Sequence, residues 1–541
     1  MLEGLMMDTP LALGQFAERV RTFFPKREIV SRQPDGSLQR TTYADWYRRT
    51  CKLAGALTRL GVQPGDRVGS LCWNHARHLE LYFAVPGIGA VLHTLNLRLH
   101  ASELAYIASH AGDRVIVVDR SLYGLLGEFR NELPKLEKVI VVADDGPTPS
   151  GELDYEEWLK GEPDAFEWPR IDERAAAMMC YTSGTTGRPK GVLYSHRSTA
   201  LHTLALCMVD TKGVSERDVI LPAVPMFHAN AWGLPFAAVC TGAKLVFPGP
   251  NLQPEAMLDL MAKERVTFSA GVPTIWLGAL ALLDDAPKRW DLSAMRALAI
   301  GGSAAPPALI DGLQRRHGIH VIHAWGMTET NPLATVSRMK QHLEGRSTEE
   351  DLATRAKQGY AVPLIEQRHV DDTGHVLPWD GSTMGELEVR GPWVARAYYE
   401  NSEGADRFTA DGWFKTGDVV TIDAEGYVQI TDRSKDVIKS GGEWISTQAL
   451  ENALMSHPAV LEAAVFAGEH PKWGERPLAA VVFKPGKSAS REDLAAHLAG
   501  QFVKYWMPDD YLFLPEIPRT STGKFKKTAL RERYGKHLLQ A

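Results

Sequence analysis

The chain has 541 residues, of which 44% are hydrophobic and 23% are charged, and its formal net charge at pH 7 is −6. This is the composition of an ordinary globular protein, and the mild negative charge gives no basis for a nucleic-acid partner. Because a single hydrophobic core stops growing at roughly 250–300 residues, a chain of this length is expected to form more than one domain.

Cysteine usage and the N-terminus bear on the compartment. The chain has five cysteines, none of them in a CxxC pair: Cys51, Cys72, Cys180, Cys207 and Cys240. Their odd number favours buried free thiols in a reducing cytosol. No basic stretch followed by an apolar one opens the chain, and the longest weakly polar run, residues 231–243, is too short to cross a bilayer. We expect a cytoplasmic protein without an integral membrane segment, with peripheral contact to a membrane left open.

Two amphipathic helices are expected near the N-terminus. Apolar side chains recur at helical spacing over residues 13–24, before Pro25. A second helix is predicted to begin after Thr42, whose hydroxyl can cap its N-terminus, and to stop at Gly61.

Strands and helices then alternate, and the short, continuous apolar runs are typical of parallel strands covered on both faces. The predicted strands are 67–73, 115–119, 138–143, 244–247, 267–270 and 296–300, with a helix at 78–88. A charged, helical insertion without an assigned function is predicted at 339–357.

The pattern changes after this insertion. Hairpin signals punctuate residues 361–430, which predicts a small antiparallel subdomain. Mixed α/β structure returns after Asp432, with strands predicted at 461–467 and 478–484 and a helix at 491–502. This last part, of about 110 residues, is large enough to be a domain of its own.

Residues 181–191 read Tyr-Thr-Ser-Gly-Thr-Thr-Gly-Arg-Pro-Lys-Gly. The glycines let backbone N–H groups approach an anion closely, three hydroxyls add donors, and Lys190 adds a positive charge, so the loop suits a polyphosphate. It is not a Walker A loop, because Gly191 follows Lys190 where that motif has Ser or Thr. By itself, a turn rich in Gly and Thr is more often only a turn.

The same eleven residues resemble the signature of adenylate-forming enzymes, and the chain is similar to their acyl-CoA synthetase branch. Further matches follow in the family's order at 225–232, 301–304, 325–330, 416–418, 432–446 and 518–524. The resemblance therefore covers nearly the whole chain.

The resemblance implies an α/β fold. A large N-terminal domain, residues 1–431, would combine Rossmann-like βα subdomains with a small β-rich subdomain at about 361–431. A small, mobile α+β C-terminal domain, residues 432–541, would follow a hinge near Asp432. A homodimer is expected as well.

The implied reaction begins with attack of a carboxylate on the α-phosphorus of ATP, which gives an acyl-adenylate and pyrophosphate; the thiol of CoA then displaces AMP. Negative charge concentrates in the first step, so the protein must supply cations and hydrogen-bond donors. The resemblance assigns catalytic roles to Lys524, Lys190, His228 and Glu329. Lys524 can bridge the carboxylate and the α-phosphate with a flexible point charge.

The resemblance also implies a Mg²⁺ site at Thr185 and Glu329. A hydroxyl and one carboxylate, completed by ATP oxygens and water, suit a hard cation. Outside its motif, Glu329 would be interpreted as a surface carboxylate.

The nucleotide-binding residues that the resemblance implies are Thr182, Ser183, Gly184, Thr185, Thr186, Gly187, Lys190, Gly302, Ser303, Ala304, Ala324, Trp325, Gly326, Met327, Thr328, Asp418, Arg433, Lys435, Lys439 and Trp444. Trp325 stands where the family usually has Tyr, and either ring can stack on adenine. Asp418 can accept hydrogen bonds from both ribose hydroxyls; an Asx-turn residue is the alternative. The basic run at 433–439 is either a solvated face or meets the ribose and phosphates when the domains close. Trp444 lies near adenine or CoA, or in the core.

The acyl and CoA sites are implied at His228, Trp232, Gly302, Gly441, Gly442 and Glu443. His228 would lie beside the carboxylate. Trp232, after a predicted helix start, resembles the aromatic gate of long-chain fatty acyl-CoA synthetases, and a core tryptophan is the alternative.

We therefore expect an ATP-dependent acid–CoA ligase that uses Mg²⁺, ATP and CoA, with a medium- or long-chain fatty acid as substrate. We also expect the C-terminal domain to swing after adenylation, withdrawing Lys524 and presenting residues 441–444 to CoA. A ligase for a short or sulfur-containing acid is the nearest alternative. A luciferase-like oxygenase or a peptide-synthetase adenylation domain is disfavoured because no carrier-protein region follows Lys524. A silent nucleotide- or acyl-binding module is disfavoured because Lys190, Glu329, Asp418 and Lys524 are all present.

Overall fold

The computed structural model describes residues 1–541 except 183–187, 402–403, 434–435, 441–442, 520–524 and 540–541. The chain divides into two compact units: Met1–Ile365 with Arg390–Phe408, and Glu366–Val389 with Thr409–Ala541. The second unit thus joins most of the β-rich residues to the C-terminal ones, and the boundary expected at Asp432 stays a prediction.

A seven-stranded sheet in the first unit, counted over the described residues, has the order β7-β6-β5-β3-β4-β8-β9. Its pairs are parallel except β8 with β9. The strands are β3 (Arg67–Leu71), β4 (Val91–Thr94), β5 (Asp113–Asp119), β6 (Lys138–Val142), β7 (Leu153–Asp154), β8 (Ala176–Tyr181) and β9 (Gly191–Ser195). The strands predicted at 67–73, 115–119 and 138–143 are confirmed, whereas β4, β7, β8 and β9 were not predicted.

A nine-stranded sheet, likewise counted over the described part of the first unit, has the order β16-β15-β14-β13-β12-β10-β11-β1-β2. Its central pairs are parallel, and antiparallel pairs close both edges. The strands are β1 (Glu28–Arg32), β2 (Leu38–Thr42), β10 (Val219–Pro222), β11 (Lys244–Phe247), β12 (Phe268–Gly271), β13 (Ala297–Ile300), β14 (Val321–Gly326), β15 (Leu333–Val336) and β16 (Tyr360–Ala361). The strands predicted at 244–247, 267–270 and 296–300 are confirmed.

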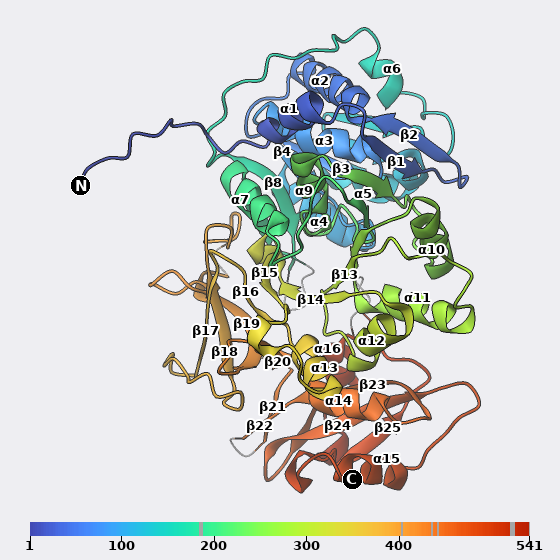
Figure 1. Ribbon diagram of the computed structural model, residues 1–541, viewed down its shortest axis with the longest axis vertical. Helices are drawn as coiled ribbons and strands as arrows, with labels where there is room; N and C mark the ends of the chain where they lie inside the picture. Colours follow the sequence, from blue (N-terminus) through green and yellow to red (C-terminus); the bar gives the residue numbers. More distant parts are fainter. Residues whose placement is uncertain (183–187, 402–403, 434–435, 441–442, 520–524, 540–541) are drawn as a thin grey trace. The chain divides into compact units, whose positions relative to one another are not determined.

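Helices connect and cover these strands, and α1, α2 and α3 pack against one another (Figure 1). The helices are α1 (Gly14–Phe23), α2 (Tyr43–Arg59), α3 (Ala76–Gly87), α4 (Ala101–Ala111), α5 (Tyr123–Phe129), α6 (Tyr155–Leu159), α7 (His196–Cys207), α8 (Ala229–Trp232), α9 (Leu234–Thr241), α10 (Pro254–Lys263), α11 (Pro273–Asp285), α12 (Pro307–Asp311) and α13 (Thr348–Ala356). The Thr42 hydroxyl accepts a hydrogen bond from the Asp45 N–H at 3.2 Å, which confirms the predicted cap of α2. Within the predicted insertion at 339–357, α13 confirms the helix.

Two apolar clusters explain why these elements stay together. One joins β5 and β6 to α4 and α5 through residues such as Ile116, Val118 and Leu104. The other joins β10, β11, β13 and β14 to α10 and α11 around Trp276 and Leu298. Each fully buried large aliphatic or aromatic side chain contributes about 1.5–3 kcal/mol by leaving water, so the clusters hold the carboxyl ends of the strands in place.

The second unit contains two further sheets, with the strand orders β17-β18-β19-β20 and β22-β21-β24-β23, and β25 beside β24. Their strands are β17 (Glu366–Val370), β18 (Gly385–Arg390), β19 (Phe414–Ile422), β20 (Val428–Arg433), β21 (Ile438–Ser440), β22 (Glu443–Ile445), β23 (Val460–His470), β24 (Gly474–Phe483) and β25 (Asp510–Phe513). The antiparallel pairing of β18, β19 and β20 confirms the predicted antiparallel region.

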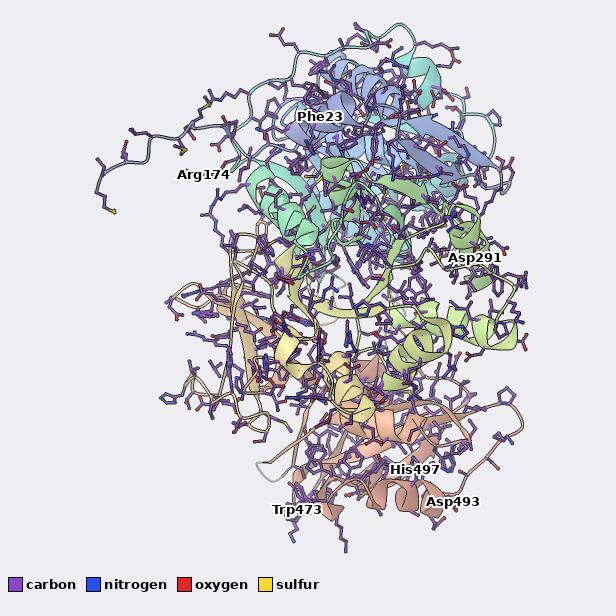
Figure 2. All side chains as sticks on the ribbon, viewed as in Figure 1. Phe23, Arg174, Asp291, Trp473, Asp493 and His497 are labelled. Atoms are coloured by element: carbon purple, nitrogen blue, oxygen red, sulfur yellow. The ribbon has the colours of Figure 1, made fainter. Side chains whose placement is uncertain are left out.

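The helices of the second unit are α14 (Thr447–Met455), α15 (Arg491–Ala499) and α16 (Lys527–Tyr534). Figure 2 marks Asp493 and His497 on α15; the Asp493 N–H donates to the capping Ser490 hydroxyl at 3.1 Å. The strands predicted at 461–467 and 478–484 and the helix predicted at 491–502 are confirmed. Within the described residues of both units, we find no helix whose length and apolarity would let it cross a membrane.

Candidate functional site

Two hydrogen bonds join the ends of the phosphate loop, Thr182 and Lys190. The Thr182 N–H donates to the Lys190 carbonyl at 2.9 Å, and the Thr182 hydroxyl accepts from the Lys190 N–H at 3.1 Å. These bonds close the loop between the antiparallel strands β8 and β9. The predicted ligands Ser183, Gly184, Thr185, Thr186 and Gly187 lie outside the described residues.

Close packing explains why a glycine follows Lys190. A Cβ at Gly191 would lie 2.8 Å from the Met179 Cε and 3.0 Å from the Tyr181 Cζ. The Gly191 carbonyl also accepts from the Tyr399 N–H at 2.9 Å. Glycine thus permits the close approach of three segments at the base of the loop, which a Walker A residue would obstruct.

Tyr398 lies between the two charged residues predicted for the phosphate site. Its hydroxyl donates to Glu329 Oε1 at 2.6 Å, and the Lys190 Nζ lies 5.1 Å from the centre of its ring. A Cβ at Gly404 would lie 3.1 Å from that Nζ and 2.5 Å from the Tyr398 ring. The sequence analysis missed Tyr398, because a pair of tyrosines after an apolar run carries no signal of a site.

Glu329 is 5% exposed, in the single-turn helix Thr328–Thr330. Burial, together with the Glu329 carboxylate, raises the pKa of Tyr398 far above its usual range, so the phenol keeps its proton and donates. A carboxylate with one oxygen held by a phenol can offer the other to a hard cation, which prefers oxygen ligands. Glu329 therefore fits the expected Mg²⁺ site.

The turn after β13 and the end of β14 line the same region. Gly302 has φ +79°, and a Cβ at Gly301 would lie 2.7 Å from the Ala324 carbonyl oxygen. Trp325 is 6% exposed, and the Thr328 carbonyl accepts from the Tyr194 hydroxyl of β9 at 2.7 Å. The structure thus brings Thr328 against β9, a strand of the phosphate loop, and Gly301 against the end of β14.

A Cβ at Gly326 would overlap the Pro332 carbonyl oxygen. Since that oxygen belongs to the backbone, the turn that carries Glu329 would have to shift.

The segment that carries His228 and Trp232 has an unusual backbone. Residues Ala229, Asn230, Ala231 and Trp232 all have positive φ, between 41° and 56°. The expected ordinary helix start is therefore wrong: α8 is a left-handed turn, in which each side chain crowds the following carbonyl.

Contacts with β4, with α3 and with the loop before α3 hold this segment. The Met226 N–H donates to Asn74 Oδ1 at 2.7 Å, the Tyr82 hydroxyl donates to the Met226 carbonyl, and the Thr94 hydroxyl donates to the Phe227 carbonyl at 3.3 Å. The far end of the Trp232 indole lies 3.4 Å from where Cβ atoms would be built on Gly301 and Gly302. The predicted gate and the predicted glycines are thus in contact.

In the second unit, Asp418 lies on β19 and is 1% exposed. Its N–H donates to the Thr416 hydroxyl at 3.1 Å, and it pairs in register with Arg433 of β20. Arg433, Lys439, Glu443 and Trp444 lie on strands β20–β22, whereas Lys435, Gly441 and Gly442 lie outside the described residues.

Lys524 also lies outside the described residues, but the residues on both sides of the segment 520–524 are joined by backbone hydrogen bonds. Arg519 and Phe525 form an antiparallel bridge, and the Lys526 N–H donates to the Pro518 carbonyl at 2.7 Å. On the next residue, the Lys527 Nζ lies 2.7 Å from Glu451 Oε1.

The expected hinge residue, Asp432, belongs to the same group of charged residues as Lys527 and Glu451. Its Oδ2 accepts from the Thr447 N–H at 2.6 Å, at the N-terminus of α14. Lys527 and Arg531 face the carboxylates of Asp432, Asp436 and Glu451, so acids outnumber bases. The surrounding carboxylates raise the pKa of Lys527, and burial raises the pKa of Glu451 to about 7. Sequence analysis missed Glu451 and Lys527.

Tyr398→Phe should weaken Mg²⁺-dependent ATP binding while leaving the ring contact with Lys190. A hydrogen bond to a charged group contributes about 1.5–3 kcal/mol, so affinity for Mg·ATP should fall by about tenfold or more. Titration calorimetry with and without Mg²⁺ measures this, with Tyr399→Phe as the control. Equal affinities in wild type and Tyr398→Phe would contradict the assigned role.

Gly326→Ala should destabilise the protein by more than about 2 kcal/mol, because the new Cβ meets backbone. Thermal unfolding measures the loss. Gly124→Ala, on α5 with open space at its Cβ, is the matched control and should be neutral. An unchanged melting temperature for Gly326→Ala would contradict the packing described.

Glu451→Gln should remove the change in the free energy of unfolding that protonation of Glu451 causes between about pH 4.5 and 7. The folded pKa of about 7 exceeds the ordinary value of 4.5, so the folded protein holds an extra proton between these pH values. The stabilisation, about 3 kcal/mol, is fully present below pH 4.5 and lost as the pH rises through 7. Urea unfolding from pH 5 to 8 tests this, with the exposed Glu469→Gln as control. A slope that persists in Glu451→Gln would assign it to another group.

The chain matches known proteins over nearly its whole length. Residues 16–399 match the model of the AMP-binding enzyme family, and residues 449–524 match the AMP-binding enzyme C-terminal domain. A long-chain-fatty-acid–CoA ligase of Thermus thermophilus is 51% identical over 98% of this chain and 96% of its own length. A medium-chain-fatty-acid–CoA ligase of Ectopseudomonas oleovorans is 41% identical over 99% of this chain and 98% of its own.

Two further similarities bear on the substrate. A 3-methylmercaptopropionyl-CoA ligase of Ruegeria lacuscaerulensis is 41% identical over 98% of both chains. The crystal structure of the anthranilate CoA ligase AuaEII in complex with anthranoyl-AMP is similar with a TM-score of 0.86, at 27% identity over 99% of both chains. This chain belongs to the AMP-binding enzyme family.

Proposed function

We propose that the protein is an ATP-dependent, AMP-forming acid–CoA ligase whose preferred substrate is a medium- or long-chain fatty acid. One observation carries the proposal beyond family membership: Tyr398 holds a buried carboxylate, Glu329, and a cation, Lys190, at the base of the phosphate loop. This pairing of groups serves a reaction that gathers negative charge on phosphates.

Each predicted site residue would have a separate role in the adenylation step. Lys190 and the loop hydroxyls would bind the phosphates, and His228 would orient the acid. Glu329 and Thr185 would hold Mg²⁺, which neutralises phosphate charge when bound. Asp418 would accept from the ribose hydroxyls, and Trp325 would stack on adenine.

The acid is proposed from two observations. The named substrates of two relatives are long- and medium-chain fatty acids, and Trp232 lies buried beside the Gly301–Gly302 turn, as a gate across an apolar tunnel would. A short, sulfur-containing acid is the second candidate, because the ligase from Ruegeria lacuscaerulensis is as similar to this chain as the medium-chain ligase is.

The second step would use a different placement of the C-terminal residues. Lys524 would serve adenylation and then withdraw, and residues 441–444 would approach CoA, with Asp432 as the hinge. The fastened ends of the segment 520–524 support this role, because the whole of α16 would carry Lys524 with it.

Lys524→Ala should abolish adenylation but spare thioester formation from a preformed acyl-adenylate. Pyrophosphate–ATP exchange reports the first half-reaction, and CoA-dependent AMP release from synthetic adenylate reports the second. Lys526→Ala, an exposed lysine two residues on, is the control. An equal loss of both half-reactions would remove the support for alternation.

A panel of acids from three to eighteen carbons, including 3-methylmercaptopropionate, tests the substrate. We expect CoA-dependent AMP release to be fastest with acids of about eight to eighteen carbons, since each buried CH₂ contributes about 0.8 kcal/mol. Faster turnover of 3-methylmercaptopropionate would favour the second candidate. No exchange with any acid would reject the proposed function.

A further inference from the structure

Lys212 is a buried lysine to which the reaction assigns no role. Its side chain is among the largest fully buried ones, with 1% of the residue exposed. Burying an ammonium costs free energy unless a carboxylate pairs with it, and within the described part of the chain no carboxylate forms an ion pair with Lys212. A residue this costly needs another reason for its position.

Lys212 faces Trp232. Its Nζ lies 5.8 Å from the centre of the indole, within the range of a cation–π interaction. Tryptophan has the most favourable ring face for a cation, and loss of water from both groups strengthens the attraction. The interaction therefore connects an otherwise unpaired charge to the residue proposed as the acyl gate.

The backbone that carries Lys212 is fixed from two directions. Arg296 donates to the Lys212 carbonyl at 3.0 Å and to the Gly213 carbonyl at 3.1 Å. Arg338 donates to the Thr211 carbonyl at 2.8 Å. The ammonium is thus presented from a rigid loop rather than from a mobile surface segment.

Trp232, by contrast, ends a strained turn. Four consecutive residues without the freedom of glycine have positive φ, and such strain persists only where surrounding contacts hold it. The Cη2–Cζ2 edge of the indole lies against the Gly301–Gly302 backbone. A cation over the ring and a glycine surface at its edge therefore hold an element that would relax if released.

We propose that Lys212 is a positioning residue for the gate: its ammonium holds the Trp232 indole against the Gly301–Gly302 turn and so determines how readily a long acyl chain displaces it. The inference rests on the proposed function, because a gate matters only if an acyl chain enters there. An acid too short to displace the indole should not depend on Lys212.

Among the ionisable groups described around Trp232, Lys212 is the one whose charge is expected to change near neutral pH. Burial, with a smaller contribution from the nearby Lys212 charge, lowers the pKa of His202 on α7 to about 3. His202 is therefore neutral. The neighbouring loop and strands bring Arg296, which is paired with Asp218, and Arg338, which lies near Asp210. Burial lowers the pKa of Lys212 itself to about 7.

The test compares Lys212→Met, which removes the charge and keeps the length, with Lys212→Arg, which keeps both. Loss of a desolvated cation–π interaction should lower the KM for a sixteen-carbon acid by about tenfold, while the KM for propionate stays within twofold. Lys212→Arg should stay near wild type. The exposed Lys263→Met on α10 is the control for removal of a lysine.

The wild-type pH profile gives a second readout that a structural role would not produce. As the pH rises through about 7, Lys212 loses its proton, the gate is freed, and the KM for the long acid should fall. In Lys212→Met this step should be absent. The profile needs no variant, so it tests the proposal even if Lys212→Met does not fold.

The last comparison is in a Trp232→Ala background. There, Lys212→Met should change the KM for the long acid by less than twofold, because the indole that it restrains is gone. Equal effects in both backgrounds, equal effects of Met and Arg, or a flat wild-type profile would each overturn the proposal. Absence of pyrophosphate exchange in wild type would instead reject the proposed function, so the two failures are distinguishable.

Discussion

The hydrogen bond from Tyr398 to Glu329 is the interaction on which the nucleotide site depends. It fixes a carboxylate that is 5% exposed, and the same ring faces the Lys190 ammonium. Removing either charge from water is costly, and the phenol offsets that cost without adding a charge of its own. Both the cation and the anion of the site thus contact the same tyrosine, Glu329 through its hydroxyl and Lys190 through its ring.

Glycines make this arrangement possible. Gly191, Gly301 and Gly326 each stand where a Cβ would meet another segment, so the motif glycines bring strands and turns into contact as well as leaving N–H groups free for phosphates. This explains why the loop ends in Lys-Gly. The requirement comes from the packing of Met179 and Tyr181 behind the loop as much as from the nucleotide.

Much of the fold could be predicted from local pattern. The Thr42 cap, the apolar strands and the hairpin-rich region are encoded in short stretches, and the structure has them. The hairpin of β1 and β2 was missed because β2, Leu-Gln-Arg-Thr-Thr, has an exposed, polar character that resembles a loop. The left-handed turn at 229–232 was missed because its sequence, Ala-Asn-Ala-Trp, contains no glycine to signal positive φ, and the residues that hold the preceding segment, such as Asn74, are distant in the sequence.

The candidate site was predictable where a motif carried it and not where partners come from distant segments. Glu329, Gly302 and Trp232 follow from the resemblance, whereas Tyr398 and Glu451 acquire their roles only from tertiary contacts. Lys212 is the clearest case. In the sequence it is one lysine among 60 basic residues, and only its burial makes it conspicuous.

The course of the chain through its two units also limits how the protein can be divided. The first unit is not one stretch: Arg390–Phe408 belongs to it, although the strands before and after that segment belong to the second unit. A fragment cut after Ile365 would keep the phosphate loop and Glu329 and lose Tyr398. A fragment of the first unit that retains Tyr398 must therefore either continue through β17 and β18 to Phe408 or receive residues 390–408 through a designed linker or as a separate peptide.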